Sequence, residues 1–208
     1  MSFDRLAPFY DRLEALTAGP RLHRARTAWL DALTGRKRIL SLGEGHGRFA
    51  AACAARWPDA ELTCVEASPG MLAAARTRCG EHASRIRWIE ADATTWTPDG
   101  PYDAIVTCFF LDCFPAETVD ALVHRYAAAA APDALWLVAD FAVPARGPAR
   151  WRAQAVHALM YGFFRLVTRL PARRLSPPDN ALRAEGFTLA GRAESEWGLL
   201  RADLWHRA

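Results

Sequence analysis

Residues 39–49, I-L-S-L-G-E-G-H-G-R-F, decide the fold of this chain. The apolar run that ends at Leu42 predicts a strand, and the residues after Gly47 have helical spacing, so the stretch predicts a strand, a tight turn and a helix. Gly43, Gly45 and Gly47 have no Cβ, which lets the backbone turn sharply and approach a ligand closely. The helix that follows offers free N–H groups at its start. The stretch therefore predicts a nucleotide-binding turn, with a plain strand-to-helix connection as the simpler alternative.

The spacing of the glycines narrows the class of nucleotide. The dehydrogenase fingerprint G-x-G-x-x-G would place its last glycine at Arg48, whereas here the third glycine comes one residue earlier. The pattern G-x-G-x-G resembles motif I of the class I S-adenosylmethionine-dependent methyltransferases. This resemblance implies S-adenosyl-L-methionine as the cofactor, with Gly43, Gly45 and Gly47 in the loop that binds it.

Alternating strand and helix patterns around this stretch predict an α/β fold. The expected strands span 38–42, 61–66, 86–90, 102–109, 135–141, 187–194 and 198–206. The expected helices span 3–16, 20–33, 48–57, 69–79, 115–130, 149–170 and 178–184. The short connection between the last two strands predicts an antiparallel hairpin. The expected fold is a Rossmann-like three-layer sandwich with a mostly parallel seven-stranded sheet and a C-terminal antiparallel hairpin. This architecture is similar to the class I methyltransferase fold.

The whole chain, 1–208, is expected to form a single class I methyltransferase domain, because 208 residues are an ordinary length for one domain. The expected regions are an N-terminal helical lid at 1–36, a cofactor-binding core at 37–142, substrate-cover helices at 143–186 and the terminal hairpin at 187–208.

Composition and cysteine usage predict a globular protein that works in the cytoplasm. Apolar residues make up 51% and charged residues 24% of the chain, and no run is apolar for long enough to span a bilayer. The N-terminal stretch carries acids and does not resemble a signal peptide. The five cysteines are an odd number without C-x-x-C spacing, which favours reduced thiols over disulfides or a zinc site. The histidines are scattered, and no metal is expected.

Two acids follow neighbouring strands and are candidates for nucleotide recognition. Glu66 ends the second expected strand, where a carboxylate can accept both hydroxyls of a ribose. Ala67 and Met71 would lie nearby, against the adenine. The resemblance implies that Asp92 accepts a hydrogen bond from the adenine amino group and that the N–H of Ala93 meets the ring. The alternatives are a helix-capping acid at Glu66 and a loop acid in an Asx turn at Asp92.

The methionine end of the cofactor departs from the family pattern. The family usually carries an acid two residues before the first glycine, which helps to hold the methionine amino group, but here that position is Ser41. Glu44, inside the loop, is a candidate to replace it. The opening F-D-R-L-A-P-F-Y-D resembles the ubiquinone and menaquinone C-methyltransferase branch, in which an early tyrosine region folds over the cofactor. Tyr10 is the candidate for that lid, with a packing tyrosine as the alternative.

The stretch 107–115, T-C-F-F-L-D-C-F-P, leaves the fourth strand at the carboxyl edge of the sheet, where open α/β sheets bind their ligands. Cys108 and Phe109 are expected to border the cofactor, with Cys108 as a packing residue rather than a nucleophile. Asp112 is a candidate base or orienting group, and a helix N-cap is its alternative. The stretch lacks the N-P-P-Y of amino-methyltransferases that act on DNA bases, so no nucleic acid is expected as a partner.

The helix expected at 149–170 lies where the family builds its substrate cover. One face of this helix is apolar: Val156, Leu159, Met160, Phe163, Val167 and Leu170. His157 and Tyr161 favour the opposite face, one turn apart. They are candidate catalytic residues that could face the transferred methyl group, with a hydrogen-bonded structural pair as the alternative.

The segment 141–178 contains no acid and seven arginines: Arg146, Arg150, Arg152, Arg165, Arg169, Arg173 and Arg174. Basic charge beside an apolar helix face suits an acidic or amphiphilic substrate, or an anionic membrane surface. The position of the segment above the carboxyl edge of the sheet favours the role toward the substrate.

Three hypotheses of function stay open at this stage. The first is methyl transfer to O, N, S or C of a small molecule, by positioning and with the help of one base. The second is methylation of a lipid-like or quinone substrate at a membrane surface, without stable insertion. The third is a non-catalytic domain that binds S-adenosylmethionine. A monomer and a homodimer are both compatible with the sequence.

Overall fold

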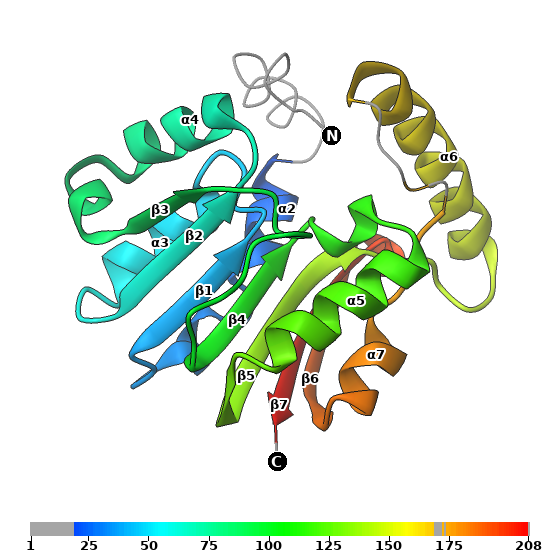
Figure 1. Cartoon of the computed structure of the whole chain (residues 1–208). Helices are drawn as coiled ribbons and strands as arrows, with labels where there is room; N and C mark the ends of the chain where they lie inside the picture. Colours follow the sequence, from blue (N-terminus) through cyan, green and yellow to red (C-terminus); the bar gives the residue numbers. More distant parts are fainter. Residues whose placement is uncertain (1–18, 169–171, 173, 208) are drawn as a thin grey trace.

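A computed structural model describes residues 19–168, 172 and 174–207 of the chain. Its centre is a seven-stranded sheet in the order β3-β2-β1-β4-β5-β7-β6 (Figure 1). The strands are β1 (Arg38–Leu42), β2 (Glu61–Glu66), β3 (Arg87–Glu90), β4 (Tyr102–Cys108), β5 (Ala130–Phe141), β6 (Phe187–Ser195) and β7 (Leu200–Arg207). The strands β1 to β5 pair in parallel, and β7 is antiparallel to both β5 and β6. The predicted α/β fold with a terminal antiparallel hairpin is confirmed.

Helices cover both faces of the sheet. They are α2 (Gly19–Thr27), α3 (Arg48–Arg56), α4 (Pro69–Cys79), α5 (Ala116–Ala127), α6 (Pro148–Thr168) and α7 (Asp179–Ala184). Short 3-10 turns are η1 (Leu30–Leu33), η2 (Gly80–Arg85), η3 (Leu111–Cys113) and η4 (Glu196–Gly198). In Figure 1, α2, α3 and α4 lie on one face and α5 and α7 on the other, while α6 stands at the carboxyl edge. Within the described part of the chain, every helix is too short or too polar to cross a bilayer.

Two apolar layers hold the helices on the sheet, because successive strand residues point to opposite faces. Leu40 and Trp136 pack with α5 and α7 on one face. Ile39, Val106 and Leu137 pack with α3 on the other. Since both faces are covered, the central strands are apolar throughout, as is usual for parallel sheets.

The strand β5 begins five residues earlier than predicted. The stretch A-A-P-D-A, residues 130–134, contains a Pro-Asp pair that is typical of a turn. Ala130 nevertheless pairs with Tyr102, and the register then shifts, so that Ala104 pairs with Leu135. An irregularity inside the strand accommodates the proline, which the local pattern alone could not indicate.

The helix α6 buries only part of the predicted apolar face, on which Val156 and Met160 are half-buried. Leu159, placed on the inward stripe by its spacing, is 77% exposed. Ala153, His157 and Tyr161, which follow one another at intervals of four residues, are buried instead. Tyr161 finds a partner there, because its hydroxyl donates to the carbonyl of Asp112 at 3.0 Å. The apolar spacing therefore predicted the buried face of α6 only in part, because the hydrogen bond of Tyr161 also contributes to its orientation.

Candidate active site

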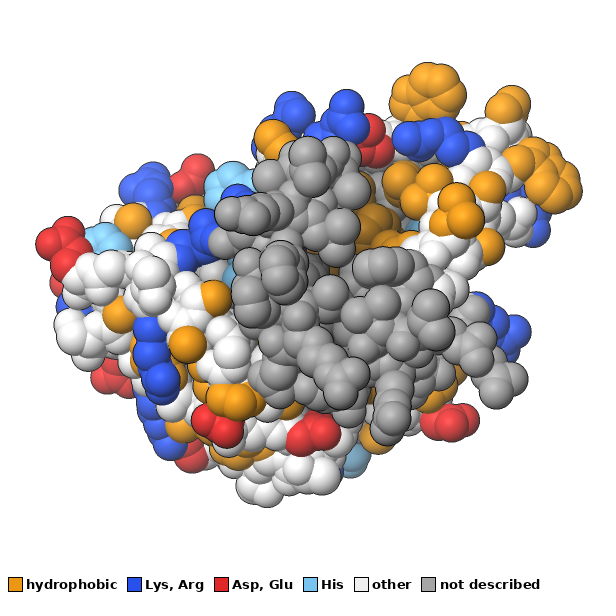
Figure 2. All heavy atoms as spheres, turned by 90° about the horizontal axis from the view of Figure 1, so that it is seen from above, with side chains coloured by type: hydrophobic (Ala, Val, Ile, Leu, Met, Phe, Trp, Pro, Cys, Tyr) orange, Lys and Arg blue, Asp and Glu red, His pale blue; other side chains and the backbone are white. Residues whose placement is uncertain are grey.

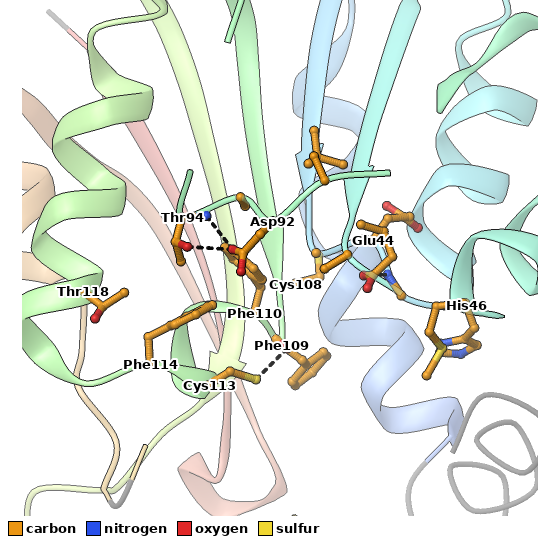
Figure 3. Close-up of a pocket in the computed structure, with 18 of the residues that line it drawn as sticks. Glu44, His46, Asp92, Thr94, Cys108, Phe109, Phe110, Cys113, Phe114 and Thr118 are labelled. Atoms are coloured by element: carbon orange, nitrogen blue, oxygen red, sulfur yellow. Dashed lines mark hydrogen bonds between the residues drawn. The ribbon is translucent and has the colours of Figure 1, made fainter. Parts of the chain in front are cut away.

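A cavity of about 430 Å³ opens at the carboxyl ends of β1, β2 and β4 (Figure 3). Its volume lies within the range of roughly 300–1,000 Å³ that is typical of small-molecule sites. Most of the residues predicted to bind the cofactor line it: Gly43, Glu44, Gly45, Glu66, Ala67, Met71, Asp92, Ala93, Cys108 and Phe109. The topology therefore brings four separate sequence segments to one site.

The three glycines of the loop have positive φ angles but serve different purposes. A Cβ on Gly43 would lie 2.1 Å from the ring of Phe110, and one on Gly47 would lie 2.6 Å from the Cα of Ala75. A Cβ on Gly45 would meet no protein atom within 4 Å. Gly43 and Gly47 therefore allow the loop to pack closely, and Gly47 does not line the cavity. Gly45 is the glycine that keeps the backbone open to a ligand.

The carboxylate of Glu66 is held at the end of β2 by the backbone. The amide of Gly45 donates to Oε2 at 3.0 Å, and the amide of Ser68 donates to Oε1 at 2.9 Å. Ser68 is itself the N-cap of α4, with Oγ accepting from the amide of Met71 at 3.1 Å. Each carboxylate oxygen can accept more than one hydrogen bond. The backbone therefore fixes the carboxylate at the wall of the cavity.

Asp92 follows β3 and forms the Asx turn that was its alternative interpretation. Its Oδ1 accepts from the amide of Thr94 at 2.8 Å and from the hydroxyl of Thr94 at 2.7 Å (Figure 3). The turn uses one oxygen, so Oδ2 can accept from a ligand in the cavity that Asp92 lines. The carbonyl of Ala93 accepts from the hydroxyl of Tyr126 at 2.7 Å, which fixes the loop beside it.

Ser41 and Glu44 form a pair at the end of β1. The hydroxyl of Ser41 donates to Oε2 of Glu44 at 2.5 Å, and the amide of Ala50 donates to Oε1 at 2.9 Å. Burial raises the pKa of Glu44 to about 7. Glu44 lines the cavity, whereas Ser41 does not. The loop thus carries a carboxylate back to the strand end where the family pattern has its acid.

Arg26, His46 and Phe110 also line the cavity, although sequence reasoning did not single them out. Arg26 comes from α2, and its guanidinium lies 4.8 Å from the ring centre of Phe109. Burial, with help from neighbouring arginines, lowers the pKa of His46 to about 3, so its ring is neutral. Arg26 precedes the glycine loop by many residues, and no sequence signal linked the two. Phe110 and His46 lie inside the two motifs quoted above, in which other residues were assigned to the site.

The two residues at the end of β4 border the cavity as predicted. Phe109 has a φ of 53°, a strained conformation for a residue with a side chain. Its amide donates to the carbonyl of Ala139 at 2.7 Å, and its ring meets Phe141 edge-on at 5.3 Å. Burial raises the pKa of the Cys108 thiol, which keeps it protonated. Cys108 is therefore a wall of the cavity and not a nucleophile.

The predicted catalytic residues Asp112, His157 and Tyr161 are all buried, but none of them lines the cavity. Beyond the contact of Tyr161 with Asp112, the ring of His157 lies edge-on to Phe141 at 5.9 Å and to Tyr161 at 6.1 Å. Asp112 does not cap α5, whose N-cap is Pro115. The structure therefore brings the three residues together, in a cluster beside the cavity.

Cys113 connects this cluster with the cavity. Its thiol lies 3.5 Å from Oδ1 of Asp112, and the residue also lines the cavity (Figure 3). Burial raises the pKa of Asp112 and lowers the pKa of His157. Among the described residues, Nε2 of His157 has no hydrogen-bond partner. The cluster therefore holds a neutral imidazole with an unused nitrogen, and Tyr161 links this imidazole to the backbone of Asp112.

Several of the predicted residues lie outside the described residues or away from the cavity. Tyr10 lies outside the described residues, as do the side chains of Phe163, Arg165, Val167, Arg169 and Leu170. Within the described part of the chain, no three His, Cys, Asp or Glu residues gather as metal ligands. Four arginines of the acid-free segment are exposed and do not line the cavity: Arg146, Arg150, Arg152 and Arg174.

The glycine turn, the carboxylate at the end of β2 and the acid after β3 surround one cavity at the carboxyl edge of a Rossmann-like sheet, and these features define a nucleotide-binding class of protein. Residues 39–133 match the sequence profile of a family described as "Methyltransferase domain". Over 207 aligned residues the chain is 30% identical to a demethylmenaquinone methyltransferase from Deinococcus radiodurans, covering 92% of this chain and 85% of that protein. The chain belongs to the class I S-adenosylmethionine-dependent methyltransferase family.

Other relatives match over shorter parts. A demethylmenaquinone methyltransferase from Thermus thermophilus is 35% identical over 148 residues, which cover 70% of this chain and 66% of that protein. A trans-aconitate 2-methyltransferase from Streptomyces avermitilis is 44% identical over 80 residues, covering 38% of this chain and 30% of that protein. The chain thus spans less than two thirds of these two curated relatives.

Solved structures share the fold. The mitomycin 7-O-methyltransferase superposes with a TM-score of 0.73 at 21% identity, covering 100% of this chain and 61% of that one. The magnesium protoporphyrin IX methyltransferase from Synechocystis PCC 6803 with bound SAH has a TM-score of 0.65 at 18% identity, covering 90% of this chain and 84% of that one. At these identities the likeness concerns the fold alone.

Proposed function

We propose that this protein binds S-adenosylmethionine in the cavity and transfers its methyl group to a small-molecule acceptor. One observation carries the proposal: a glycine turn and two acids, Glu66 and Asp92, converge on one cavity at the carboxyl edge of the sheet, in a chain of this family. The cavity volume of about 430 Å³ and the acceptor atoms along its wall suit a nucleoside.

The cofactor is oriented by hydrogen-bond acceptors of the chain. Glu66 accepts from the two ribose hydroxyls, a role that its backbone contacts support because they hold the carboxylate at the wall of the cavity. Oδ2 of Asp92 accepts from the adenine amino group, and the N–H of Ala93 meets the ring. Ala67 and Met71 provide the apolar surface against the adenine.

The methionine amino group is held by the Ser41–Glu44 pair. Glu44 supplies the carboxylate that the family pattern places two residues before the first glycine, and Ser41 fixes it through the 2.5 Å hydrogen bond. A cationic amino group beside Glu44 would favour the ionised carboxylate, against the burial that raises its pKa. The acid that the family pattern places at position 41 is thus supplied by Glu44 in this chain. Tyr10 remains the proposed lid.

When bound, the cofactor supplies a methyl group on a sulfonium, which needs little further activation. The chain then has to align the acceptor and exclude water, and such alignment supplies a large part of the rate. The rings of Phe109, Phe110 and Phe114 give the cavity an apolar wall. Nε2 of His157 can receive a proton from the acceptor, because it is neutral and unpartnered among the described residues. Asp112 and Tyr161 position this end of the site.

The nature of the acceptor is a finer part of the proposal. The four described arginines of the acid-free segment face solvent, so they support an amphiphilic acceptor better than an acidic one. Similarity to two demethylmenaquinone methyltransferases favours a quinone-like acceptor as the second candidate. Trp151 and Leu159 of α6 are 74% and 77% exposed, and Figure 2 shows orange hydrophobic side chains beside blue basic ones at this end of the molecule.

The cellular setting is likewise proposed. All five cysteines are free thiols, which supports a reducing compartment such as the cytoplasm. We propose that the protein acts there as a monomer or a homodimer.

Mass spectrometry tests the proposed function. The protein is incubated with a metabolite extract and S-adenosylmethionine that carries a labelled methyl group. We expect S-adenosylhomocysteine to form together with at least one labelled small molecule. Glu66→Ala serves as the negative control, because it removes the ribose acceptor. Binding of the cofactor without a labelled product in any extract would contradict catalysis and favour a non-catalytic binding domain.

A further inference from the structure

Two buried carboxyl groups, Asp112 and Asp140, lie together beside the cavity. They are 6% and 7% exposed. Asp112 belongs to η3, directly after β4, and Asp140 is the residue before the end of β5. Burial, together with repulsion from Asp112, raises the pKa of Asp140. Cys108 pairs with Ala139 in the sheet, so the two acids follow neighbouring strands at the same edge and form a carboxyl pair there.

The pair has no cation of its own among the described residues. Arg201 is paired with Asp140 across β5 and β7 and lowers its pKa. Its guanidinium, however, is bonded to Asp179 at 2.6 Å and to Asp203 at 3.0 Å. A buried carboxylate that lacks a dedicated cation is expensive to maintain. We therefore expect a bound molecule to supply a hydrogen-bond donor to the carboxyl pair.

Unused polar atoms mark where such a partner would bind. Oδ1 of Asp140 and Nε2 of His157 are buried and have no hydrogen-bond partner among the described residues. His157 contacts the ring of Phe141, the residue after Asp140. It also contacts Tyr161, whose hydroxyl binds the carbonyl of Asp112. An unused acceptor and an unused ring nitrogen thus lie near the same end of β5.

The cluster adjoins the cofactor cavity through its wall. Cys113 contacts Asp112 and lines the cavity, next to Phe109 in Figure 3. Phe110 lines the cavity as well, two residues before Asp112. An acceptor that sits against Cys113 and Phe110 would therefore meet the carboxyl pair with one end and the cofactor with the other.

We propose that Asp112 and Asp140 form the acceptor end of the active site and select molecules that present a neutral hydroxyl or an amino group over molecules that present a carboxylate. This inference rests on the proposed function. A hydroxyl or amine donates to the unused Oδ1, whereas a carboxylate brings a further negative charge next to two buried acids and has no proton to donate. A site built to receive a hydrogen-bond donor strongly rejects an analogue that lacks one.

Matched aromatic probes test the proposal without knowledge of the natural acceptor. The two pairs are phenol with benzoate and 1-naphthol with 1-naphthoate. Within each pair, one probe carries a hydroxyl where the other carries a carboxylate. Their binding to the protein saturated with S-adenosylhomocysteine is measured by calorimetry at pH 7.5, followed by methyl transfer from S-adenosylmethionine. We expect the hydroxyl probe of at least one pair to bind at least about tenfold more tightly than its carboxylate partner.

Asp140→Asn and, independently, Asp112→Asn should reduce this preference to within about threefold, because each replaces one carboxyl group of the pair by an amide of nearly the same shape. Asp133→Asn, an exposed residue near the opposite end of β5, is the control that should leave the preference unchanged. Affinity for S-adenosylhomocysteine should change by less than about twofold in all three variants, since none lines the cofactor cavity.

Equal or tighter binding of the carboxylate probes, failure of both pairs to bind, or an unchanged preference in both Asp→Asn variants would overturn the proposal. Failure of the proposed function looks different, because the wild-type protein would then not bind S-adenosylhomocysteine in the first titration.

Discussion

Replacing Gly45 and Gly47 in turn by alanine separates the ligand-facing part of the loop from its packing part. Both residues have positive φ, 63° and 83°, where a Cβ costs about 1–2 kcal/mol. A Cβ on Gly47 would also lie 2.6 Å from the Cα of Ala75, while one on Gly45 would meet no protein atom. Overpacking costs ~1–3 kcal/mol, so we expect the free energy of unfolding to fall by about 1–2 kcal/mol in Gly45→Ala and by about 2–5 kcal/mol in Gly47→Ala.

Cofactor binding should respond in the opposite order. Gly45 lines the cavity, so the added methyl of Gly45→Ala takes ligand space. We expect it to weaken S-adenosylhomocysteine binding at least about tenfold, the equivalent of ~1.4 kcal/mol. Gly47→Ala should keep most of the affinity in molecules that remain folded. Urea denaturation gives the stabilities, and calorimetry well below the melting temperature gives the affinities. Equal destabilisation by both changes, or full affinity in Gly45→Ala, would refute this division of roles.

Three further predictions follow from the site. Glu66→Gln should weaken S-adenosylhomocysteine binding by about 10- to 100-fold in calorimetry, because a hydrogen bond to a charged acceptor is worth ~1.5–3 kcal/mol, whereas Glu61→Gln at the exposed other end of β2 should not. Burial raises the pKa of Glu44 from 4.5 to about 7, so the folded state holds the extra proton, and stability should fall as pH rises from 4.5 to 7. Urea titrations should show this fall in the wild type and not in Glu44→Gln, and a fall that persists in the variant would assign it to other groups. Tyr161→Phe should lower the free energy of unfolding by ~1 kcal/mol, because the carbonyl of Asp112 loses its buried donor, and an unchanged value would show that this bond contributes little.

The fold was largely predictable because its signals are local. The glycine turn, the apolar strands and the short final connection each depend on neighbouring residues, and the structure confirms β1, β2 and α4 at the predicted residues. The start of β5 was missed because pairing with β4 overrides the turn signal of Pro132 and Asp133. Strand pairing of this kind is a tertiary effect that no local window contains.

The candidate site was predictable only in part. Glycine turns and acids at strand ends have fixed positions in such sheets, so Glu66 and Asp92 could be assigned to the cavity from the sequence. Arg26 could not, because only the packing of α2 brings it there. The buried face of α6 was predicted only in part, because hydrophobic spacing gave no weight to His157 and Tyr161, whose buried contacts come from η3 and β5.

A single calorimetric comparison shows whether the protein binds the nucleoside of a methyltransferase or that of a dehydrogenase. Calorimetry of the wild-type protein with S-adenosylhomocysteine and, separately, with NAD compares the two nucleotides that a Rossmann-like sheet commonly binds. We expect saturable binding of S-adenosylhomocysteine with one site per chain and no measurable binding of NAD. Binding of NAD together with no binding of S-adenosylhomocysteine would contradict it.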